Sequence, residues 1–350
     1  MEQRREVVNR YVQQGLRTSI AFPLAELPRS TYYYKPKPGP KGRKPSTHTW
    51  LETGELMTNE EVVELIKSIC LEPFLDYGAD RMCLELKNRG LIINKKKVYR
   101  LMKVHNLLYP KKGPTGSKPR KRVVSGSPCP NYPFEVIEID IKYIYIHGAG
   151  RNAYLLTALD TFTRIALAWR LDYKMKATQI VELTQTMLEG YPSAWAEGTL
   201  LRIRTDNGPQ FISKTLREAI ESLPFEHEFI QPRTPQQNGH VESFHHTVAK
   251  LVTSCYEFED LEQATKIFNQ FYDVYNNKRI KEELLGKSPT QFYQLWQENK
   301  IGINNANHQT KFFFKEKPSR SYGSPSEDVL VALQTNNLNK LNSTPIPNSV

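Results

Sequence analysis

The sequence predicts an α/β fold: a mixed sheet flanked by helices, preceded by an all-helical N-terminal region. Two observations support this fold class. Apolar and polar residues alternate with strand periodicity between residues 134 and 171, and helical and strand patterns then alternate as far as residue 244. Residues 58–108 show only helical periodicity. With 350 residues, the chain is long enough for two or three domains.

The helical region, residues 58–108, is expected to form three short helices. Thr58 and Glu61 have capping-box spacing before the first, and Asn94 is expected to cap the third. One face of the third helix is apolar, and the other carries Lys95, Lys96, Lys97, Arg100 and Lys103. Such a helix after two others is typical of a helix-turn-helix unit that places its last helix on DNA. The alternative is a small helical bundle with a solvated basic face.

Charge is distributed unevenly along the chain. Residues 1–130 contain 25 Lys and Arg against 12 Asp and Glu, a net charge of +13, whereas the remainder has a net charge of −2. This division indicates a polyanion-binding module joined to a different domain. The predicted organisation is a partial helical segment over 1–34, a linker over 35–57, the helix-turn-helix-like domain over 58–108, a basic linker over 109–130, a catalytic core with C-terminal helices over 131–300, and a mostly disordered tail over 301–350.

Three carboxylates in the second half stand in distinctive contexts. Asp140 lies in an isoleucine-rich strand, Asp206 stands where a strand stops at an Asn-Gly turn, and Glu242 opens a helix that Asn238 is expected to cap. Thirty-five residues separate Asp206 from Glu242. Each has an ordinary alternative: a solvated strand charge beside Glu138, a turn-forming Asp, and a Glu favoured by the helix dipole.

Carboxylates from a strand, a strand end and a helix can meet and hold a divalent cation. Without a cation, three such groups would repel one another and raise their pKa values. Oxygen-only ligands favour Mg²⁺ or Mn²⁺. Two such ions, about 4 Å apart, stabilise the attacking and leaving oxygens of an in-line phosphoryl displacement.

These blocks resemble the DDE transposases of bacterial insertion sequences, of the OrfB type, in the retroviral-integrase superfamily. The motifs that carry the resemblance are Ile137-Glu-Ile-Asp-Ile-Lys-Tyr143, Thr205-Asp-Asn-Gly208, Pro235-Gln-Gln-Asn-Gly-His-Val-Glu-Ser-Phe244, Tyr275-Asn-Asn-Lys-Arg279, Gly286-Lys-Ser-Pro-Thr290 and, before the core, Pro28-Arg-Ser-Thr-Tyr-Tyr33, Tyr77-Gly-Ala-Asp-Arg81 and Asn94-Lys-Lys-Lys-Val-Tyr-Arg-Leu-Met102. The resemblance implies a ribonuclease-H-like core whose Asp140, Asp206 and Glu242 are catalytic and bind two Mg²⁺ or Mn²⁺ ions. It also implies DNA cleavage and strand transfer by a homo-oligomer assembled on DNA.

One position departs from the pattern of that family. Its members usually carry Lys or Arg seven residues after the glutamate, where this chain has Ala249. Lys250 lies one step further, rotated by about 100° around an α-helix. Three alternatives follow: Lys250 reaches DNA, His246 takes its place, or activity is impaired. Asp160 is expected to lie in a turn away from the metals, so that its replacement by Asn would be mild.

Two other functions remain open at this point: a ribonuclease-H-like nuclease without strand transfer, and a non-catalytic, regulatory DNA-binding copy. The four cysteines are far apart and indicate reduced thiols. No stretch approaches 18 apolar residues, and the N-terminus lacks the apolar core of a signal peptide. We therefore expect a cytoplasmic, nucleoid-associated bacterial protein without membrane contact. An OrfA-type partner stays open.

Overall fold

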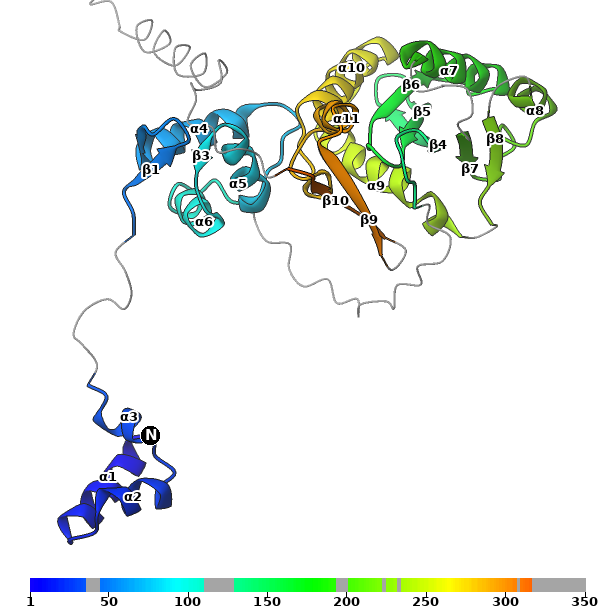
Figure 1. The fold of residues 1–350 in the computed structure, drawn as a ribbon. Coiled ribbons are helices and arrows are strands. Elements are labelled where there is room, and N and C mark those ends of the chain that lie inside the picture. The colour runs from blue at the N-terminus through cyan, green and yellow to red at the C-terminus, as the bar shows by residue number, and fades with distance from the viewer. Residues whose placement is uncertain are drawn as a thin grey trace, which may run out of the picture. The chain divides into compact units, whose positions relative to one another are not determined.

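The computed structural model describes residues 1–35, 45–109, 129–192, 201–221, 225–231, 234–306 and 309–316. The chain divides into two compact units, residues 1–46 and residues 47–350 (Figure 1). In the described ranges, no helix combines the length and the apolar composition needed to cross a bilayer.

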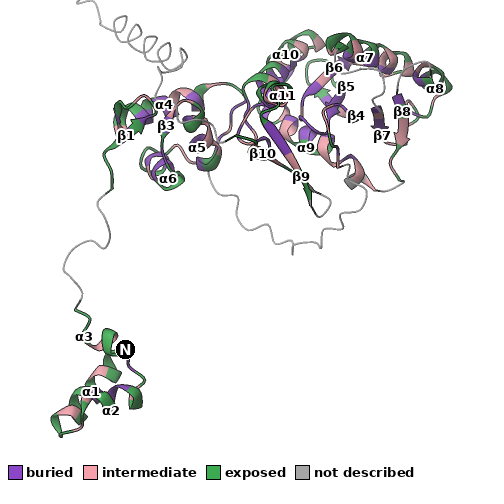
Figure 2. Ribbon diagram, viewed as in Figure 1, coloured by how far each residue is buried: buried purple, intermediate pink, exposed green. Residues whose placement is uncertain are grey.

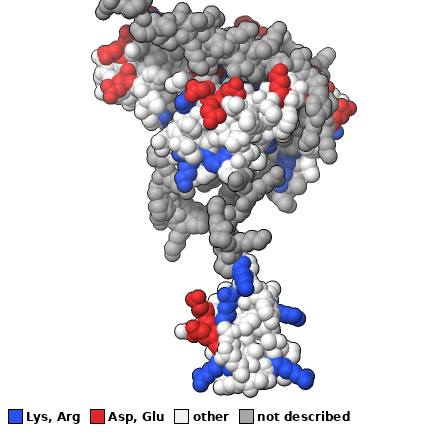
Figure 3. All heavy atoms as spheres, turned by 90° about the vertical axis from the view of Figure 1, so that its left-hand side faces the viewer, with Lys and Arg blue, Asp and Glu red and all other residues white. Residues whose placement is uncertain are grey.

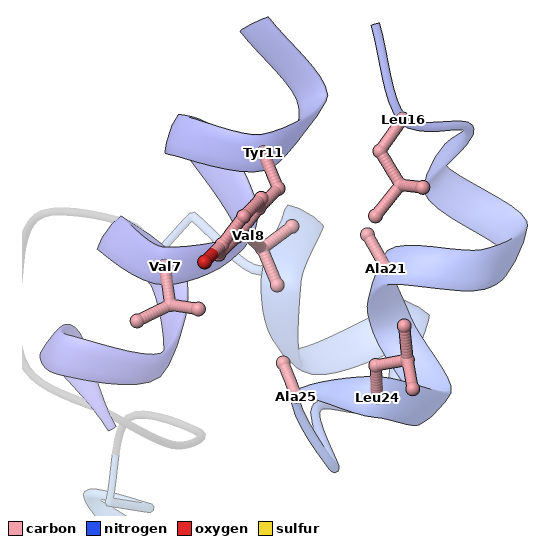
Figure 4. Close-up of a pocket in the computed structure, with 7 residues that line it drawn as sticks. All are labelled: Val7, Val8, Tyr11, Leu16, Ala21, Leu24 and Ala25. Atoms are coloured by element: carbon pink, nitrogen blue, oxygen red, sulfur yellow. The ribbon is translucent and has the colours of Figure 1, made fainter. Parts of the chain in front are cut away.

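The first unit consists of the helices α1 (Glu2–Gln13), α2 (Thr18–Leu24) and α3 (Arg29–Tyr33). Its small apolar core is formed by Val8, Ala21, Phe22 and Leu27. Beside this core, α1 and α2 enclose an apolar cavity of about 250 Å³ (Figure 4). Lys and Arg side chains project around the visible face of this unit (Figure 3).

The helical part of the second unit contains α4 (Asn59–Leu71), α5 (Ala79–Asn88) and α6 (Lys95–Val104). Both predicted caps are confirmed: Glu61 N donates to Thr58 Oγ1 at 3.2 Å, and Lys97 N donates to Asn94 Oδ1 at 2.9 Å. The structure also contains a small sheet of order β2–β1–β3, built from β1 (His48–Leu51), β2 (Leu56–Thr58) and β3 (Leu91–Ile92). This part is therefore not all-helical, and β1 lies within the stretch expected to be a linker. Strands this short leave little alternation to detect.

The central sheet has the order β6–β5–β4–β7–β8. Its strands are β4 (Val136–Ile146), β5 (Arg151–Asp160), β6 (Ala166–Asp172), β7 (Leu201–Thr205) and β8 (Phe225–Phe229). The first three form an antiparallel meander, and β7 and β8 run parallel to β4. This mixed topology is the ribonuclease-H-like arrangement, which confirms the predicted fold class.

Helices cover both faces of this sheet, whose strands are largely buried (Figure 2). On one face, α7 (Ala177–Gly190) and α8 (Lys214–Glu221) share an apolar cluster with Ile137 and Ile139 of β4. On the other, α9 (Gly239–Val248) and α10 (Leu261–Asn277) share a cluster with Ile144 and Ile146. The strand that carries Asp140 is thus held from both sides.

The chain around these helices contains several short elements. The 3₁₀-helix η2 (Pro235–Asn238) precedes α9, the π-helix η3 (Ala249–Thr253) continues it, and the 3₁₀-helix η4 (Glu282–Leu284) follows α10. Next come α11 (Pro289–Gln297) and the hairpin of β9 (Ile301–Ala306) and β10 (Gln309–Phe314). This hairpin occupies part of the stretch expected to be a disordered tail, because Ile301 packs against Phe292 of α11 and against Phe162. Residues 317–350 lie outside the described residues.

The helical part and the core share one apolar cluster. Phe74 packs edge-on against Phe271 of α10, with ring centroids 5.5 Å apart. The Tyr77 hydroxyl accepts a hydrogen bond from Ile280 N at 2.8 Å, and Arg279 Nη1 donates to Phe74 O at 2.8 Å. The motifs that begin at Tyr77 and end at Arg279 are therefore two sides of one intramolecular junction.

Candidate active site

Asp140 and Asp206 come together because β4 and β7 are parallel neighbours in the sheet. Asp140 lies within β4, and Asp206 follows directly after the last residue of β7. Burial raises the pKa of Asp206, the negative charge of Asp140 raises it further, and the hydrogen bond from Gly208 N to Asp206 Oδ1, at 2.9 Å, opposes both effects. A buried carboxylate beside a second negative charge is an arrangement that a divalent cation relieves.

Glu242 lies in the first turn of α9, and its side chain is exposed. The buried Val241 and Phe244 hold this helix against the sheet. Glu242 lines a cavity of about 460 Å³, whose other lining residues are Ile141, Lys142 and Tyr143 of β4 and His245, His246 and Ala249 of α9 and η3. Glu242, the third carboxylate, therefore shares a cavity with residues of β4, the strand that carries Asp140.

A second contact ties α9 to Asp140. His245, three residues after Glu242, is buried, and its Nδ1 lies 3.2 Å from Asp140 Oδ2. Its Nε2 is buried and has no hydrogen-bond partner within the described part of the chain. The pairing orients the Asp140 carboxylate and fixes the first turns of α9 beside it.

The donor set fits a divalent ion that is completed by substrate. Within the described ranges, no three His, Cys, Asp or Glu side chains converge closely enough to hold a metal ion by themselves. The structure places Asp140 and Asp206 near enough for their charges to interact, and Glu242 lines the cavity beside β4. Mg²⁺ is usually held by one or two carboxylates together with water and substrate phosphate. An aspartate pair with a third carboxylate nearby matches that preference better than a closed protein cage would.

The cationic residues expected near Glu242 are separated by the structure. Ala249 lines the cavity, whereas the Lys250 ammonium forms an ion pair with Asp76 and lies 5.9 Å from the centroid of the Tyr109 ring. His246 is exposed and lines the cavity. Lys142, which also lines the cavity, is not among the site residues predicted from the sequence. Its position two residues after Asp140, on the same face of an alternating strand, was the signal that could have found it.

The basic residues of α6 also differ from one another. Lys96 and Lys103 are exposed, Arg100 is half-buried, and Lys95 forms an ion pair with Asp80. Lys97 is a correction to the predicted basic face: its side chain is buried, and its Nζ donates to His48 O at 2.6 Å. Burial, aided by the charge of Arg100, lowers the pKa of Lys97. The small sheet that the sequence did not reveal supplies this acceptor.

Asp160 has a structural role that its local sequence does not reveal. Its side chain is 0% exposed. It accepts hydrogen bonds from Phe134 N at 3.0 Å, Phe162 N at 3.2 Å and Thr163 N at 2.7 Å, and from Thr163 Oγ1 at 2.5 Å. Four donors converging on a buried carboxylate fix the turn between β5 and β6. Its replacement by Asn was expected to be mild, and these contacts instead predict a destabilising substitution.

Comparison with known proteins gives matches along most of the described second unit. Two families described as integrase core domains match residues 130–235 and 224–289, and a family described as an HTH-like domain matches residues 58–114. The transposase for insertion sequence element IS904 of Lactococcus lactis is 26% identical over 246 residues, which cover 67% of this chain and 93% of that protein. The putative transposase InsK for IS150 of Escherichia coli is 23% identical over 277 residues, covering 77% of this chain and 90% of the relative.

One further relative and one solved structure are also similar to this chain. An uncharacterized 39.2 kDa protein of insertion element IS476 from Xanthomonas euvesicatoria is 26% identical over 298 residues, covering 83% of this chain and 77% of that protein. The catalytic domain of the Mos1 mariner transposase is 14% identical, with a TM-score of 0.35, covering 47% of this chain and 78% of that one. With an HTH-like domain followed by an integrase core domain, the chain belongs to the insertion-sequence transposases of the retroviral-integrase superfamily.

Proposed function

We propose that this transposase cleaves DNA and transfers the resulting strand by metal-dependent phosphoryl transfer, with Asp140, Asp206 and Glu242 as its catalytic and metal-binding carboxylates. The observation that carries the proposal is that Asp206 lies near enough to Asp140 for their charges to interact, beside a cavity that Glu242 lines. Like charges brought together cost stability unless a cation is present, so this pair favours a bound cation.

The three carboxylates come from three elements. Asp140 on β4, Asp206 directly after β7 and Glu242 on α9 would together hold the divalent ions. Mg²⁺ or Mn²⁺ bound there would activate the nucleophile and stabilise the leaving 3′-oxygen. Gly208 N orients the Asp206 carboxylate, and His245 orients that of Asp140.

The cavity beside Glu242 is the proposed binding site for the DNA backbone. Lys142 and His246 line it and offer donors to a phosphate group. The nucleophile is water when a strand is nicked and a DNA 3′-hydroxyl when strands are joined. Relatives of this chain are named as transposases for insertion sequence elements, so the proposed substrates are element ends and target DNA. A homo-oligomer on DNA and an OrfA-type partner remain proposals.

Substitution of the carboxylates tests the proposal. Asp140→Asn, Asp206→Asn and Glu242→Gln should each abolish cleavage and joining of a labelled element end while leaving DNA affinity intact. Mg²⁺ and Mn²⁺ should support both reactions, and Ca²⁺ should not. The matched control is Glu182→Gln, which alters an exposed carboxylate of α7, on the opposite face of the sheet, that pairs with Arg170. Near-native joining by Glu242→Gln would refute the site assignment.

The same assay separates the two alternative functions. A nuclease without strand transfer would give nicked DNA but no joined product. A non-catalytic copy would bind DNA and give neither product, even with all three carboxylates intact.

A further inference from the structure

The helix that carries Glu242 receives no cap from its own sequence. Asn238 precedes α9, yet it makes no side-chain cap bond, so the predicted cap is wrong. Its Oδ1 is buried and has no hydrogen-bond partner within the described ranges. The first N–H groups of a helix require acceptors from elsewhere. Here the acceptor is Glu138, which lies 102 residues from His240 in the sequence.

Glu138 receives two backbone hydrogen bonds from the start of α9. Its Oε2 accepts from His240 N at 2.9 Å and from Val241 N at 2.7 Å, and its Oε1 lies 2.9 Å from His240 Nδ1. The Glu138 side chain is 0% exposed. A carboxylate at a helix N-terminus is favoured by the helix dipole and makes strong, directional hydrogen bonds. Because the contact is buried, water is poorly placed to take over these bonds.

Arg204 holds the same stretch of chain from the neighbouring strand. It is the residue of β7 that pairs with Glu138 of β4 in the parallel register. Its Nη1 donates to Gln237 O at 2.9 Å, and its Nη2 lies 3.0 Å from both carboxylate oxygens of Glu228 on β8. The turn before α9 is thus anchored to β7, and the first turn of α9 is anchored to β4.

These anchors lie on the strands that position the two aspartates. Glu138 lies two residues before Asp140 on β4. Arg204 lies on β7, two residues before Asp206, which directly follows that strand. Because strand side chains alternate with a period of two, Glu138 and Asp140 lie on the same face of the sheet. Glu242 follows immediately after the second amide that Glu138 holds. The start of α9, and with it the third carboxylate, is therefore tied to the strand of Asp140 by a buried side chain of that strand, in addition to the contact between His245 and Asp140.

We propose that Glu138, supported by Arg204, is the positioning residue that sets the separation between Glu242 and the two aspartates, and thereby the affinity of the site for its divalent ion. The proposal rests on the proposed function, because it takes Glu242 as a metal ligand. Without Glu138 the first turn of α9 loses its acceptor, and the exposed Glu242 is free to move within the cavity. Replacing a residue that orients a metal ligand without contacting the metal typically changes metal affinity or activity by about 10- to 100-fold.

The test uses the full-length protein with Mn²⁺ as the probe. Binding is followed by titration calorimetry, and the Mn²⁺ midpoint of DNA cleavage is measured alongside. Glu138→Ala should weaken Mn²⁺ binding and raise the midpoint by about tenfold or more, with DNA affinity unchanged within about twofold. Glu138→Gln should recover most of the loss, because its carbonyl oxygen can accept the same two N–H bonds.

Glu135→Ala provides the matched control. Glu135 is also a buried carboxylate next to β4, and it pairs with Arg202 of β7 at 2.8 Å. It anchors the same two strands, but Asn131 and Arg202, to which it is hydrogen-bonded, lie outside α9. Its replacement should lower the melting temperature without shifting the Mn²⁺ midpoint. Equal shifts in the Glu135 and Glu138 variants would overturn the proposal, because the effect would then be general loss of stability.

Further variants keep the proposal falsifiable if Glu138→Ala does not fold. Glu138→Asp retains the charge but is one methylene shorter, so it should raise the midpoint more than Glu138→Gln does. The opposite order would overturn the proposal. An unshifted midpoint in Glu138→Ala would do the same and leave the proposed function standing, provided that Asp140→Asn is inactive. Retained cleavage by Asp140→Asn would instead remove the proposed function itself.

Discussion

Lys250 and Asp76 form an ion pair that ties the end of the Glu242-bearing helical stretch to the segment between α4 and α5. The Asp76 side chain is only 8% exposed and also pairs with Arg279, which is 6% exposed. Arg81 approaches the same carboxylate at 4.0 Å. Asp76 is therefore the centre of a charge cluster at the junction between the helical part and the catalytic core.

The two partners of this ion pair should contribute very unequally to stability. Asp76→Ala leaves Arg279 buried without its counter-charge, which should cost about 3–5 kcal/mol. Lys250→Ala removes a half-exposed cation and should cost about 1 kcal/mol or less. Urea unfolding of the full chain, followed by tryptophan fluorescence, measures both. Equal costs would mean that Arg279 finds another partner and that Asp76 is not the centre of the cluster.

The same cluster predicts an acid-dependent loss of stability. Burial alone would raise the pKa of Asp76, but the charges and hydrogen bonds of Arg279 and Lys250 outweigh it and hold that pKa below its usual value. A lowered pKa in the folded state stabilises the protein above the unfolded-state pKa of about 4. This contribution should disappear as the pH falls below about 4, through the lowered pKa of the folded state. Asp76→Asn should flatten that part of a plot of unfolding free energy against pH, and an unchanged slope would contradict the assignment.

The cavity beside Glu242 favours His246 and Lys142 over Lys250 as its DNA-contacting residues. Both line the cavity, whereas Lys250 is committed to Asp76. Lys142→Ala and His246→Ala should each weaken binding of an element end and slow strand transfer, and Lys142→Arg should retain activity. Lys174→Ala, which removes an exposed lysine outside the cavity, is the control. If Lys250→Ala reduced DNA binding and strand transfer more than either cavity variant, Lys250 would be the DNA-contacting residue, as one of the sequence-based alternatives holds.

Asp160→Asn should be severely destabilising and not mild. Its carboxylate accepts four hydrogen bonds in a fully buried turn. An amide places an NH₂ group against donors, so a cost of about 2–5 kcal/mol is expected. Thermal unfolding of the variant checks this directly. A change in melting temperature as small as that of an exposed carboxylate variant would show that the turn can rearrange.

Long, strongly periodic elements could be predicted from the sequence. The meander, the helices on both faces and the caps at Thr58 and Asn94 follow from local residue patterns, and each was confirmed. The strand contexts of Asp140 and Asp206 likewise depend only on nearby residues. The position of Glu242 beside that strand came from the family resemblance.

What the sequence did not reveal depends on residues far apart in the chain. Glu138 looked like a solvated neighbour of Asp140, yet it is buried because α9 begins over it. Asn238 is a residue type that commonly caps helices, but the first N–H groups of α9 donate instead to Glu138 of β4. Lys97 belongs to the basic face by periodicity and is buried by β1, a strand too short to detect. Periodicity shows which face of an element is apolar, but not which distant element supplies a buried acceptor.

The basic face of α6 retains four residues once Lys97 is excluded. Lys96 and Lys103 are exposed, Arg100 is half-buried, and Lys95 already pairs with an acidic neighbour. The net charge of +13 on residues 1–130 makes this face one of several candidates for binding phosphates. Exposed lysines on a helix laid along DNA lie against phosphates, so they should dominate the salt dependence of binding.

Binding isotherms at several salt concentrations test this division. Neutralising one lysine that pairs with a phosphate should reduce the log–log salt slope by about one. Lys96→Gln with Lys103→Gln should therefore lower the slope by about two, and Lys95→Gln by less, because that charge is already paired. Lys97→Met is the internal control: it should lower the melting temperature, since His48 O loses its donor, and leave the slope unchanged. Equal slopes for the double variant and the native chain would show that this face is only a solvated surface, with DNA held elsewhere in the basic front half.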